Sequence, residues 1–385
     1  MNPLRLAIVT ETYVPDVNGV ANSLRHLLSA LSDDIRIQII RTKPATDWCP
    51  EHEEVWTPGI TIPMYPDLQL GLPARRRVKR VWDSFQPDIV YIATEGPLGW
   101  SAFNEARDRQ IPVVSAFHTN FHRYSGYYGM EWVKTLILRW LRRFHNRTAR
   151  TIVPSADVGS DLTDSGFERV EVLPHGVDCQ LFNPQRRSQR LRQQWGVNDT
   201  QKTLLYVGRI AAEKNIPLAI KAWQECRKEN PELALVMVGD GPLRQTLEQE
   251  YPDIIFAGVQ KGEALARYFA SADAFIFPSL TETFGLVTLE AMASGLPVAA
   301  FDMAAAALHV CSGQNGELAS CTNDDEFVTA LKRLLAADLR SYSVHARKEA
   351  EIASWDSVAT RFEAILREVV REAGNSQEES IQQLV

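Results

Sequence analysis

The chain has 385 residues, of which 45% are hydrophobic and 23% charged, and its formal net charge is −7. The length exceeds that of a usual single core, so we expect two domains of about 150 to 200 residues each. No uninterrupted apolar run of about 18 residues occurs, which argues against a membrane-spanning helix. The acidic balance without a recognised binding module argues against nucleic acid as a partner.

The N-terminus and the cysteines predict a cytoplasmic protein. The first apolar run breaks at Thr10 and Glu11 without a cleavage pattern, so it predicts a strand and not a signal peptide. The five cysteines are odd in number and scattered, without metal-ligand spacing, which favours reduced thiols.

The first part of the chain alternates predicted strands with predicted helices. The strands cover residues 4–11, 35–42, 87–94, 111–117 and 151–155, and the helices cover 20–31, 74–85 and 101–109. Strands linked by helices form parallel sheets, so residues 1–177 predict a Rossmann-like domain. Residues 43–73 are expected to form a long loop, and the segment after residue 172, with two prolines and a glycine, predicts a hinge.

The turn after the first strand carries Asn18 and Gly19. A glycine lets the backbone approach a phosphate group or a second substrate closely. Gly19 is therefore a candidate contact for a phosphate-bearing donor substrate, and Asn18 is a candidate contact for the acceptor substrate. A structural turn without a ligand is the alternative.

Two basic segments indicate an anionic membrane surface. Residues 75–150 hold 14 Lys+Arg against 6 Asp+Glu, and five of these cations cluster at the start of one predicted helix: Arg75, Arg76, Arg77, Lys79 and Arg80. Residues 131–150 predict a helix with cations over much of its surface and one apolar face formed by Trp132, Val133, Leu136, Ile137, Trp140, Leu141 and Phe144. This is the composition of an interfacial helix, although a helix that packs on its own domain also has an apolar face, and the cation cluster also fits a solvated helix face.

His118 follows the strand 111–117 directly, at the carboxyl end of the predicted sheet. There its imidazole can donate or accept a hydrogen bond at a sugar or acceptor hydroxyl. His122 and Tyr124 follow closely and are candidates for the acceptor entrance. A histidine satisfied within the core is the alternative for His118.

The second part repeats the same alternation. Its predicted strands begin at residues 202, 233, 254, 274 and 297, and its predicted helices cover 216–230, 243–251, 262–272 and 287–295. Residues 178–355 therefore predict a second Rossmann-like domain. A closing helix is predicted over 356–373, and the polar, Gln/Glu-rich residues 374–385 predict a disordered tail.

Arg209 and Lys214 lie just after the strand that begins at residue 202. A guanidinium and an ammonium can neutralise the charge that develops on a leaving nucleoside diphosphate, without a metal ion. Gly239 and Gly241 follow the next strand and permit close approach of a nucleotide, although a plain turn explains them equally well.

Two carboxylates, Glu282 and Glu290, flank a strand-to-helix turn. The free backbone N–H groups of Phe284, Gly285, Leu286 and Val287 can face a phosphate there, with Ser279 at the end of the strand. Glu290 can accept hydrogen bonds from ribose hydroxyls, and Glu282 from hexose hydroxyls. A capping carboxylate and an ordinary helix-surface glutamate are the alternative.

The spacing of Glu282 and Glu290 before the sequence AMASGLPV resembles the donor site of retaining glycosyltransferases of family 4, as does the Arg-x4-Lys pattern of Arg209 and Lys214. The resemblance extends over about residues 5 to 370 and implies the GT-B fold, an α/β architecture with two Rossmann-like domains facing across a cleft. It further implies that the closing helix returns to the first domain, that the first domain binds the acceptor and the second the nucleotide sugar, and that Val259 contacts the base. Asn18 departs from the family's paired glycines.

The resemblance also bears on the substrates. The sequence HTNFHRYS is similar to glycolipid-forming members, in which a histidine at the place of His118 contacts sugar and acceptor. The basic cluster Arg75–Arg80 stands where phosphatidylinositol mannosyltransferases bind membranes. We therefore expect a retaining hexosyltransferase that moves α-mannose from GDP-mannose to a lipid or glycolipid at the inner face of the membrane.

Alternatives remain open at this point. A UDP-sugar donor would make the protein a glucosyl, glucuronosyl or sulfoquinovosyl diacylglycerol synthase, and a soluble glycan is another possible acceptor. A hydrolysing sugar-nucleotide epimerase and a non-catalytic scaffold are further readings. No Asp-x-Asp motif stands in the usual strand-end setting, so no metal or other cofactor is expected.

Overall fold

The computed structural model describes residues 3–16, 18–44, 49–62, 65–118, 131–198, 200–280, 282 and 284–382. The chain forms two compact units, one of Met1–Pro174 with Trp355–Val385 and the other of His175–Ser354. The predicted domain boundaries, after residues 177 and 355, fall within three residues of these divisions.

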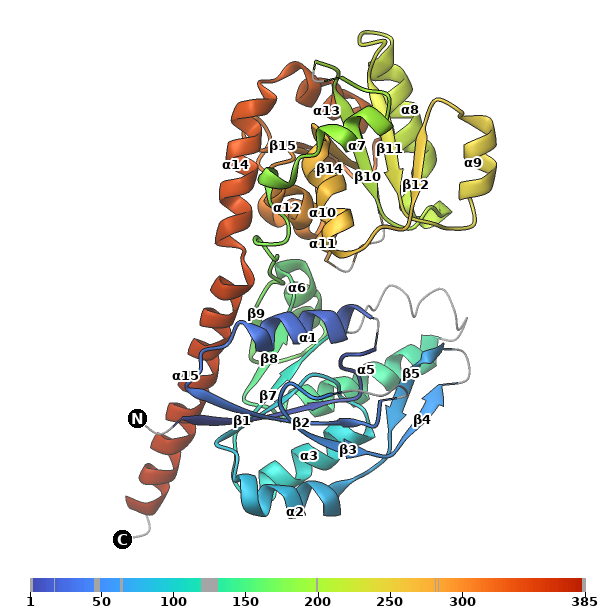
Figure 1. The fold of residues 1–385 in the computed structure, drawn as a ribbon. Coiled ribbons are helices and arrows are strands. Elements are labelled where there is room, and N and C mark those ends of the chain that lie inside the picture. Colours follow the sequence, from blue (N-terminus) through green and yellow to red (C-terminus); the bar gives the residue numbers. More distant parts are fainter. Residues whose placement is uncertain are drawn as a thin grey trace. The chain divides into compact units, whose positions relative to one another are not determined.

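The first unit contains a seven-stranded parallel sheet in the order β3-β2-β1-β6-β7-β8-β9 (Figure 1). Its strands are β1 (Leu4–Thr10), β2 (Ile35–Thr42), β3 (Glu53–Thr57), β6 (Ile89–Ile92), β7 (Val113–Ala116), β8 (Arg150–Val153) and β9 (Val170–Val172). Strands β4 (Gly59–Ile62) and β5 (Tyr65–Gly71) form a separate antiparallel hairpin.

Helices cover both faces of this sheet. Their bounds are α1 (Gly19–Ser29), α2 (Arg75–Phe85), α3 (Pro97–Asp108), α5 (Glu131–His145), α6 (Ala156–Asp164) and α15 (Trp355–Gln382). Apolar side chains of α1 and α15 share one core with β1, whereas α2, α3 and Phe144 of α5 share a second core on the other face. The parallel strands are therefore buried between two helical layers.

The segment predicted as a long loop contains β3, β4 and β5, so the loop prediction was wrong for much of its length. Its Val, Trp, Ile and Tyr residues are strand formers, and β3 adds to the sheet edge by pairing with β2. The tail prediction also differs from the structure, because α15 continues past residue 373 to Gln382. Glu and Gln have good helix propensity, and one glycine at 374 does not end a helix by itself.

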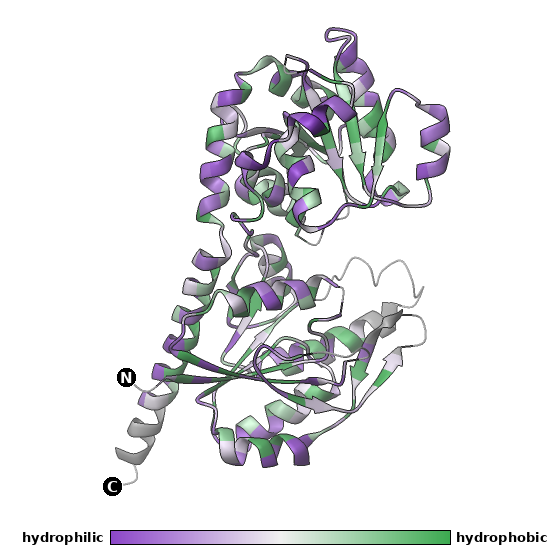
Figure 2. Ribbon diagram, viewed as in Figure 1, coloured by the Kyte–Doolittle hydropathy of each residue, from purple (hydrophilic) through white to green (hydrophobic). Residues whose placement is uncertain are grey.

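The second unit contains a six-stranded parallel sheet in the order β12-β11-β10-β13-β14-β15. Its strands are β10 (Thr203–Val207), β11 (Ala234–Val238), β12 (Ile255–Gly258), β13 (Ala274–Phe277), β14 (Val298–Phe301) and β15 (Gly316–Ala319). Its helices are α7 (Gln189–Gln194), α8 (Ile216–Arg227), α9 (Arg244–Glu250), α10 (Gly262–Ser271), α11 (Leu286–Ala293), α12 (Ala304–His309), α13 (Asp324–Ala336) and α14 (Leu339–Ile352). Most residues of these strands are hydrophobic, as the green stretches in Figure 2 show, because helices cover both faces of the sheet.

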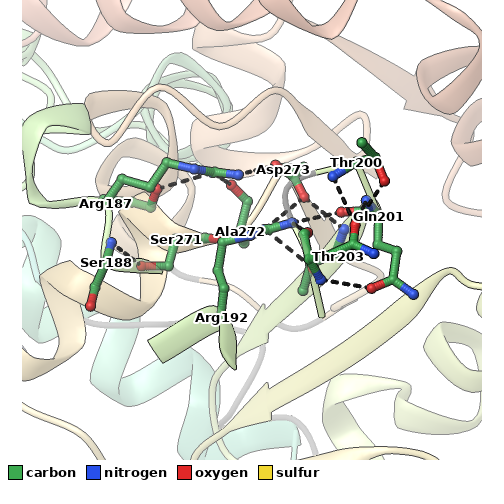
Figure 3. A network of polar contacts seen from close by, with 11 residues as sticks. Arg187, Ser188, Arg192, Thr200, Gln201, Thr203, Ser271, Ala272 and Asp273 are labelled. Carbon is green, nitrogen blue, oxygen red and sulfur yellow. Dashed lines mark hydrogen bonds and ion pairs between the residues drawn. The ribbon is translucent and has the colours of Figure 1, made fainter. Parts of the chain in front are cut away.

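A buried ion pair anchors the start of this second unit (Figure 3). The guanidinium of Arg192 on α7 is fully buried and lies 3.0 Å from Asp273, which also accepts the backbone N–H of Thr203 at 2.8 Å. Arg192 donates further hydrogen bonds to the carbonyl oxygens of Ser271, Asn198 and Gln201 at 2.7 to 2.9 Å. The pair therefore joins α7, the start of β10 and the residue before β13 into one polar network.

Candidate active site

Three of the four residues predicted to act in the reaction, Arg209, Lys214 and Glu282, follow two neighbouring strands of the second unit at their carboxyl ends. Because β10 and β13 pair directly, the segments that follow them lie side by side. After β10 the chain passes Arg209 and a short 3-10 turn over Ala212–Lys214, and after β13 it passes Ser279 and Glu282. Crevices at the carboxyl ends of parallel strands are the usual ligand sites of such sheets.

Lys214, Glu282 and Ser279 form one cluster. The Lys214 ammonium donates to Oε1 of Glu282, and the hydroxyl of Ser279 donates to the same oxygen at 2.9 Å. The Lys214 and Glu282 side chains are only 19% and 16% exposed. The sequence assigned these residues to different parts of a donor, and the structure places them in contact.

Tyr206 lies close to this cluster. Its phenol donates to the carbonyl oxygen of Arg209 at 3.0 Å. Burial raises the pKa of the Tyr206 phenol, and the charges of Glu282 and Glu213 raise this pKa further. The phenol therefore stays protonated and continues to hold the backbone at Arg209.

Arg209 is not part of the cluster itself. Its guanidinium is 64% exposed and lies 3.0 Å from Glu213, a carboxylate that the sequence analysis did not consider. No α-helix covers residues 209–213, so the four-residue spacing of Arg209 and Glu213 gave no signal for this pair.

The turn before α11 has the geometry predicted for an anion site. Gly285 precedes the helix with φ +83°, a left-handed conformation that favours glycine. Among the described residues, the N–H groups of Gly285, Leu286 and Val287 have no backbone acceptor. Phe284 is buried, and its carbonyl oxygen accepts the N–H of Ala305 at 2.7 Å, which ties the turn to α12.

A small pocket opens beside this turn. Glu282 and Ser279 form its polar side, and its apolar walls come from the ends of β13 and β14 and from the alanines that begin α12. At these strand ends the wall residues are Phe277 and Phe301, and Met303 completes the apolar walls. The carboxylate of Glu282 therefore stands at the boundary between a polar turn and an apolar wall.

Glu290 lies in the second turn of α11 with a partly buried side chain. Burial raises the pKa of the Glu290 carboxyl to about 7. Within the described residues, no side chain hydrogen-bonds to or pairs with this carboxyl, so it can accept a ligand hydroxyl.

Close packing of the backbone within the second unit explains why Gly239 and Gly241 are glycines. A Cβ on Gly239 would lie 1.9 Å from the carbonyl oxygen of Gly208, and one on Gly241 would lie 2.3 Å from that of Ile210. The loops after β10 and β11 therefore pack backbone to backbone, and a nucleotide is not needed to explain these glycines. Val259, directly after β12, is 57% exposed.

In the first unit, His118 is the second residue after β7. Burial lowers the pKa of His118 to about 4, so its imidazole is neutral at pH 7. Three residues earlier, Ser115 lies 2.9 Å from Nδ1 of the buried His145 and 2.9 Å from the hydroxyl of Thr148. Burial, with the neighbouring His118, lowers the pKa of His145 to about 3. His122 and Tyr124 lie outside the described residues.

The other predicted residues of this unit surround the end of β1. Asn18 is the N-cap of α1: its oxygen accepts the N–H of Ala21 at 2.9 Å, and its amide donates to Thr12 at 2.6 Å. Gly19 is exposed, with open space where a Cβ would lie. Both polar groups of Asn18 thus already have partners within the loop, while the backbone at Gly19 is accessible.

Glu11, at the end of β1, was missed by the sequence analysis. Its carboxylate accepts the N–H of Leu98 at 3.4 Å, and a Cβ on Gly96 would lie 2.0 Å from it. Burial raises the pKa of Glu11 to about 7 despite the backbone hydrogen bonds. A charged residue at the carboxyl end of a predicted apolar strand was the signal that could have found it.

The two basic segments differ from the prediction in detail. Arg75 pairs with Glu105 and Asp108 of α3, so it belongs to the contact between α2 and α3. Arg76, Arg77, Lys79 and Arg80 are exposed and have no ion pair with any described residue.

On α5 the apolar residues divide between two faces. Leu141 and Phe144 are buried, whereas Leu136 and Trp140 are 54% and 42% exposed. The single apolar face predicted for this helix is therefore divided. The core of the first unit buries Leu141 and Phe144 but not Leu136 and Trp140. No helix in the described ranges is long and apolar enough to cross a membrane.

Comparisons with known proteins agree with this geometry. Residues 187–351 match the family of glycosyl transferases group 1, and residues 17–181 match Glycosyltransferase Family 4. The GDP-mannose-dependent alpha-mannosyltransferase of Mycolicibacterium smegmatis is 32% identical over 375 residues, which are 94% of this chain and 98% of that protein. The alpha-monoglucosyldiacylglycerol synthase of Streptococcus pneumoniae is 31% identical over 315 residues, or 77% of this chain and 71% of that protein.

Solved structures show the same architecture. The sucrose-phosphate synthase of Thermosynechococcus elongatus superposes with a TM-score of 0.72 at 20% identity, over 96% of this chain and all of that one. This likeness, with two parallel-sheet Rossmann-like units, confirms the GT-B fold. The chain belongs to glycosyltransferase family 4 and is a glycosyltransferase.

Proposed function

We propose that this glycosyltransferase moves a hexose, with retention of anomeric configuration, from a nucleotide sugar to a hydroxyl of a lipid or glycolipid at a membrane surface. GDP-mannose is the proposed donor. The observation that carries the proposal is the cluster of Lys214, Glu282 and Ser279 beside the amino end of α11.

The chemistry follows from the charges of that cluster. The bond between the anomeric carbon and the diphosphate oxygen breaks, and a bond from the acceptor oxygen to that carbon forms on the same face. The acceptor's proton passes to the departing diphosphate, so no protein base is required. Lys214 and Arg209 stabilise the developing negative charge, together with the free N–H groups before α11. Glu282 holds hydroxyls of the sugar, and Glu290 holds those of the ribose.

In the first unit, His118 is the proposed contact for the sugar and the acceptor hydroxyl. Its lowered pKa keeps the imidazole neutral at physiological pH, so one ring nitrogen accepts a hydrogen bond while the other donates. The exposed backbone at Gly19 is the proposed donor contact of this unit, and Asn18, His122 and Tyr124 are proposed to line the acceptor side. Val259 is the proposed base contact in the second unit.

The relatives support the donor and the acceptor class. A relative matched over 94% of this chain is named a GDP-mannose-dependent alpha-mannosyltransferase, and another is named an alpha-monoglucosyldiacylglycerol synthase. The second name favours the alternative of a glucosyl transfer to a diacylglycerol acceptor. Metal-free transfer is part of the proposal, since two cations and a helix amino end can neutralise the leaving group.

Membrane attachment is supported by surface chemistry. Leu136, Arg139, Trp140 and Arg143 lie along one exposed stripe of α5, because positions three and four apart share a helix face. Apolar and cationic side chains mixed in this way suit the interface of an anionic bilayer. Arg76, Arg77, Lys79 and Arg80 of α2, which form no ion pair with any described residue, would add to the attraction.

The test is calorimetric titration of the purified protein with GDP, UDP, GDP-mannose and UDP-glucose in the presence of EDTA. Tight binding of GDP and GDP-mannose is the expected result. A preference for UDP and UDP-glucose would transfer the proposal to the glucosyl glycolipid class. Binding of no nucleotide would contradict the assignment of Lys214 and the α11 turn to a diphosphate, and repeating the titration with magnesium would show whether metal-free binding is the part that failed.

A further inference from the structure

The ion pair of Lys214 with Glu282 joins two side chains that the proposed function gives to different parts of the donor. Lys214 is assigned to the diphosphate and Glu282 to the sugar hydroxyls, yet in the ligand-free protein the ammonium donates to the carboxylate. Both side chains are more than four-fifths buried. A pair so shielded from water is screened far less than a surface ion pair.

This pairing weakens the attraction for an anion. The carboxylate neutralises the ammonium at short range, so an incoming diphosphate meets a pair with no net charge and must compete with Glu282 for Lys214. Arg209 differs, because its pair with Glu213 is exposed at 64% and 39%. Water therefore screens the Arg209 pair, and its exchange for a phosphate should have a small effect.

We propose that Glu282 is a counter-ion that the donor displaces: the diphosphate takes Lys214, and the carboxylate released by this exchange becomes the acceptor for sugar hydroxyls. The proposal rests on the proposed function and adds an order to it, in which diphosphate binding prepares the sugar contact. A nucleoside diphosphate without a sugar frees the same carboxylate but supplies no hydroxyls to it.

Ser279 is the positioning residue in this exchange. Its side chain is 2% exposed, and its hydroxyl donates to the oxygen of Glu282 that also receives Lys214. When the ammonium leaves, this hydrogen bond keeps the carboxylate in place, and the second oxygen of Glu282 stays available. Loss of Ser279 should therefore affect the sugar more than the diphosphate.

The test compares Glu282→Gln with the wild-type protein and with Glu213→Gln as the matched control. The titrant is the nucleoside diphosphate that the wild type prefers, GDP or UDP, with EDTA present. Glu282→Gln should bind it about tenfold more tightly, the strength of one charged hydrogen bond that no longer has to be broken. Glu213→Gln should change the affinity by less than about twofold, since its pair is exposed. The same Glu282→Gln protein should lose transfer activity.

Further variants test whether the gain in affinity depends on Lys214 and whether Ser279 positions the carboxylate. In Lys214→Met/Glu282→Gln the gain in diphosphate affinity should disappear, because no ammonium remains to be freed. Ser279→Ala should keep wild-type affinity for the nucleoside diphosphate, lower kcat and raise the KM for the sugar nucleotide, and Ser279→Thr should restore part of the loss. If Glu282→Gln lowers the Tm substantially, Glu282→Asp provides the comparison, with a shorter carboxylate that reaches Lys214 less well.

Unchanged or weaker diphosphate binding in both folded Glu282 variants would overturn the exchange, as would a gain that persists without Lys214. Either of these results would leave the proposed function standing, because that function fails only if the wild type binds neither GDP nor UDP. The two failures are therefore distinguishable in one set of titrations.

Discussion

The Glu290 carboxyl is a single residue whose ionisation opposes folding. Burial raises its pKa from 4.5 to about 7. The folded protein thus binds this proton more tightly than the unfolded chain, so the stabilising contribution is complete below pH 4.5 and is lost as the pH rises through 7. At pH 8 the protein holds a buried carboxylate that the described residues leave unpaired.

Glu290→Gln should therefore stabilise the protein at pH 8 while weakening nucleotide binding. The gain in unfolding free energy has an upper bound of about 3 kcal/mol, and it should shrink toward pH 5, where the wild-type carboxyl is protonated. Thermal unfolding at the two pH values measures it, with Glu232→Gln at an exposed position as the control. A gain that is equal at pH 5 and pH 8 would contradict the ionisation argument.

The buried Arg192 gives a second prediction at the residue scale. Arg192→Ala removes a fully buried guanidinium that pairs with Asp273 and donates to three buried carbonyl oxygens, and we expect a loss of about 3–5 kcal/mol in unfolding free energy. Arg187, which lies 2.8 Å from the same carboxylate but is 35% exposed, is the matched control. Arg187→Ala should change the unfolding free energy by less than about 1 kcal/mol, as measured by urea denaturation. Equal losses would show that burial does not decide the strength of these two pairs.

Single residues also show where the sequence was informative. The roles of Lys214 and Glu282 were predicted separately from their motifs, because each motif is local in the chain. Their contact was not predicted, since it depends on the pairing of β10 with β13 across a gap of two intervening strands in sequence. The packing that requires glycine at position 239 could not be predicted either, because the atom that excludes a Cβ there is the carbonyl oxygen of Gly208 in the loop after β10.

At the scale of elements, α2 separates structural cations from free ones. Replacing Arg76, Arg77, Lys79 and Arg80 by Gln should weaken binding to anionic vesicles by about 1 kcal/mol per removed charge, and the effect should fall as salt is added. Arg75→Gln should leave vesicle binding nearly unchanged, because Arg75 is engaged with α3. Sedimentation with vesicles of neutral and of anionic lipid measures both. Equal binding of the wild type to the two vesicle types would argue against an electrostatic membrane surface.

Central strands were predictable, whereas strands β9 and β15 and helices α13 and α14 were not predicted. The central strands of both sheets are mostly apolar, which is the pattern that buried parallel strands require. β3 and the β4–β5 hairpin were missed because edge and hairpin strands carry mixed polarity and prolines nearby. The face division of α5 was missed because amphipathicity shows how much apolar surface a helix has, and not how much of it the core accepts.

At the scale of the whole molecule, α15 follows the second unit in the chain but belongs to the core of the first. Phe362 is fully buried. The centroid of its ring lies 4.9 Å from the ring centroid of Tyr91 on β6, in an edge-to-face arrangement. Ion pairs support the helix from outside, with Arg150 at 2.7 Å from Glu372 and Arg367 at 2.7 Å from Asp34. The stability of the first unit therefore depends on residues that follow the whole second unit in the sequence.

Phe362→Ala should destabilise the first unit by about 3–5 kcal/mol, because it leaves a cavity in a core built from both ends of the chain. Apart from the Gly19 backbone, the proposed contacts of the base, ribose and diphosphate belong to the second unit, so GDP or UDP affinity should stay close to the wild-type value below the melting temperature. Differential scanning calorimetry with and without nucleotide separates the two effects, since a ligand raises only the transition of the unit that binds it. Arg361→Ala, an exposed neighbour on the same helix, should leave both transitions in place. A Phe362→Ala variant that loses most of its nucleotide affinity while still folded would mean that the first unit contributes more to nucleotide binding than the Gly19 backbone, and the assignment of the base and diphosphate to the second unit would then be wrong.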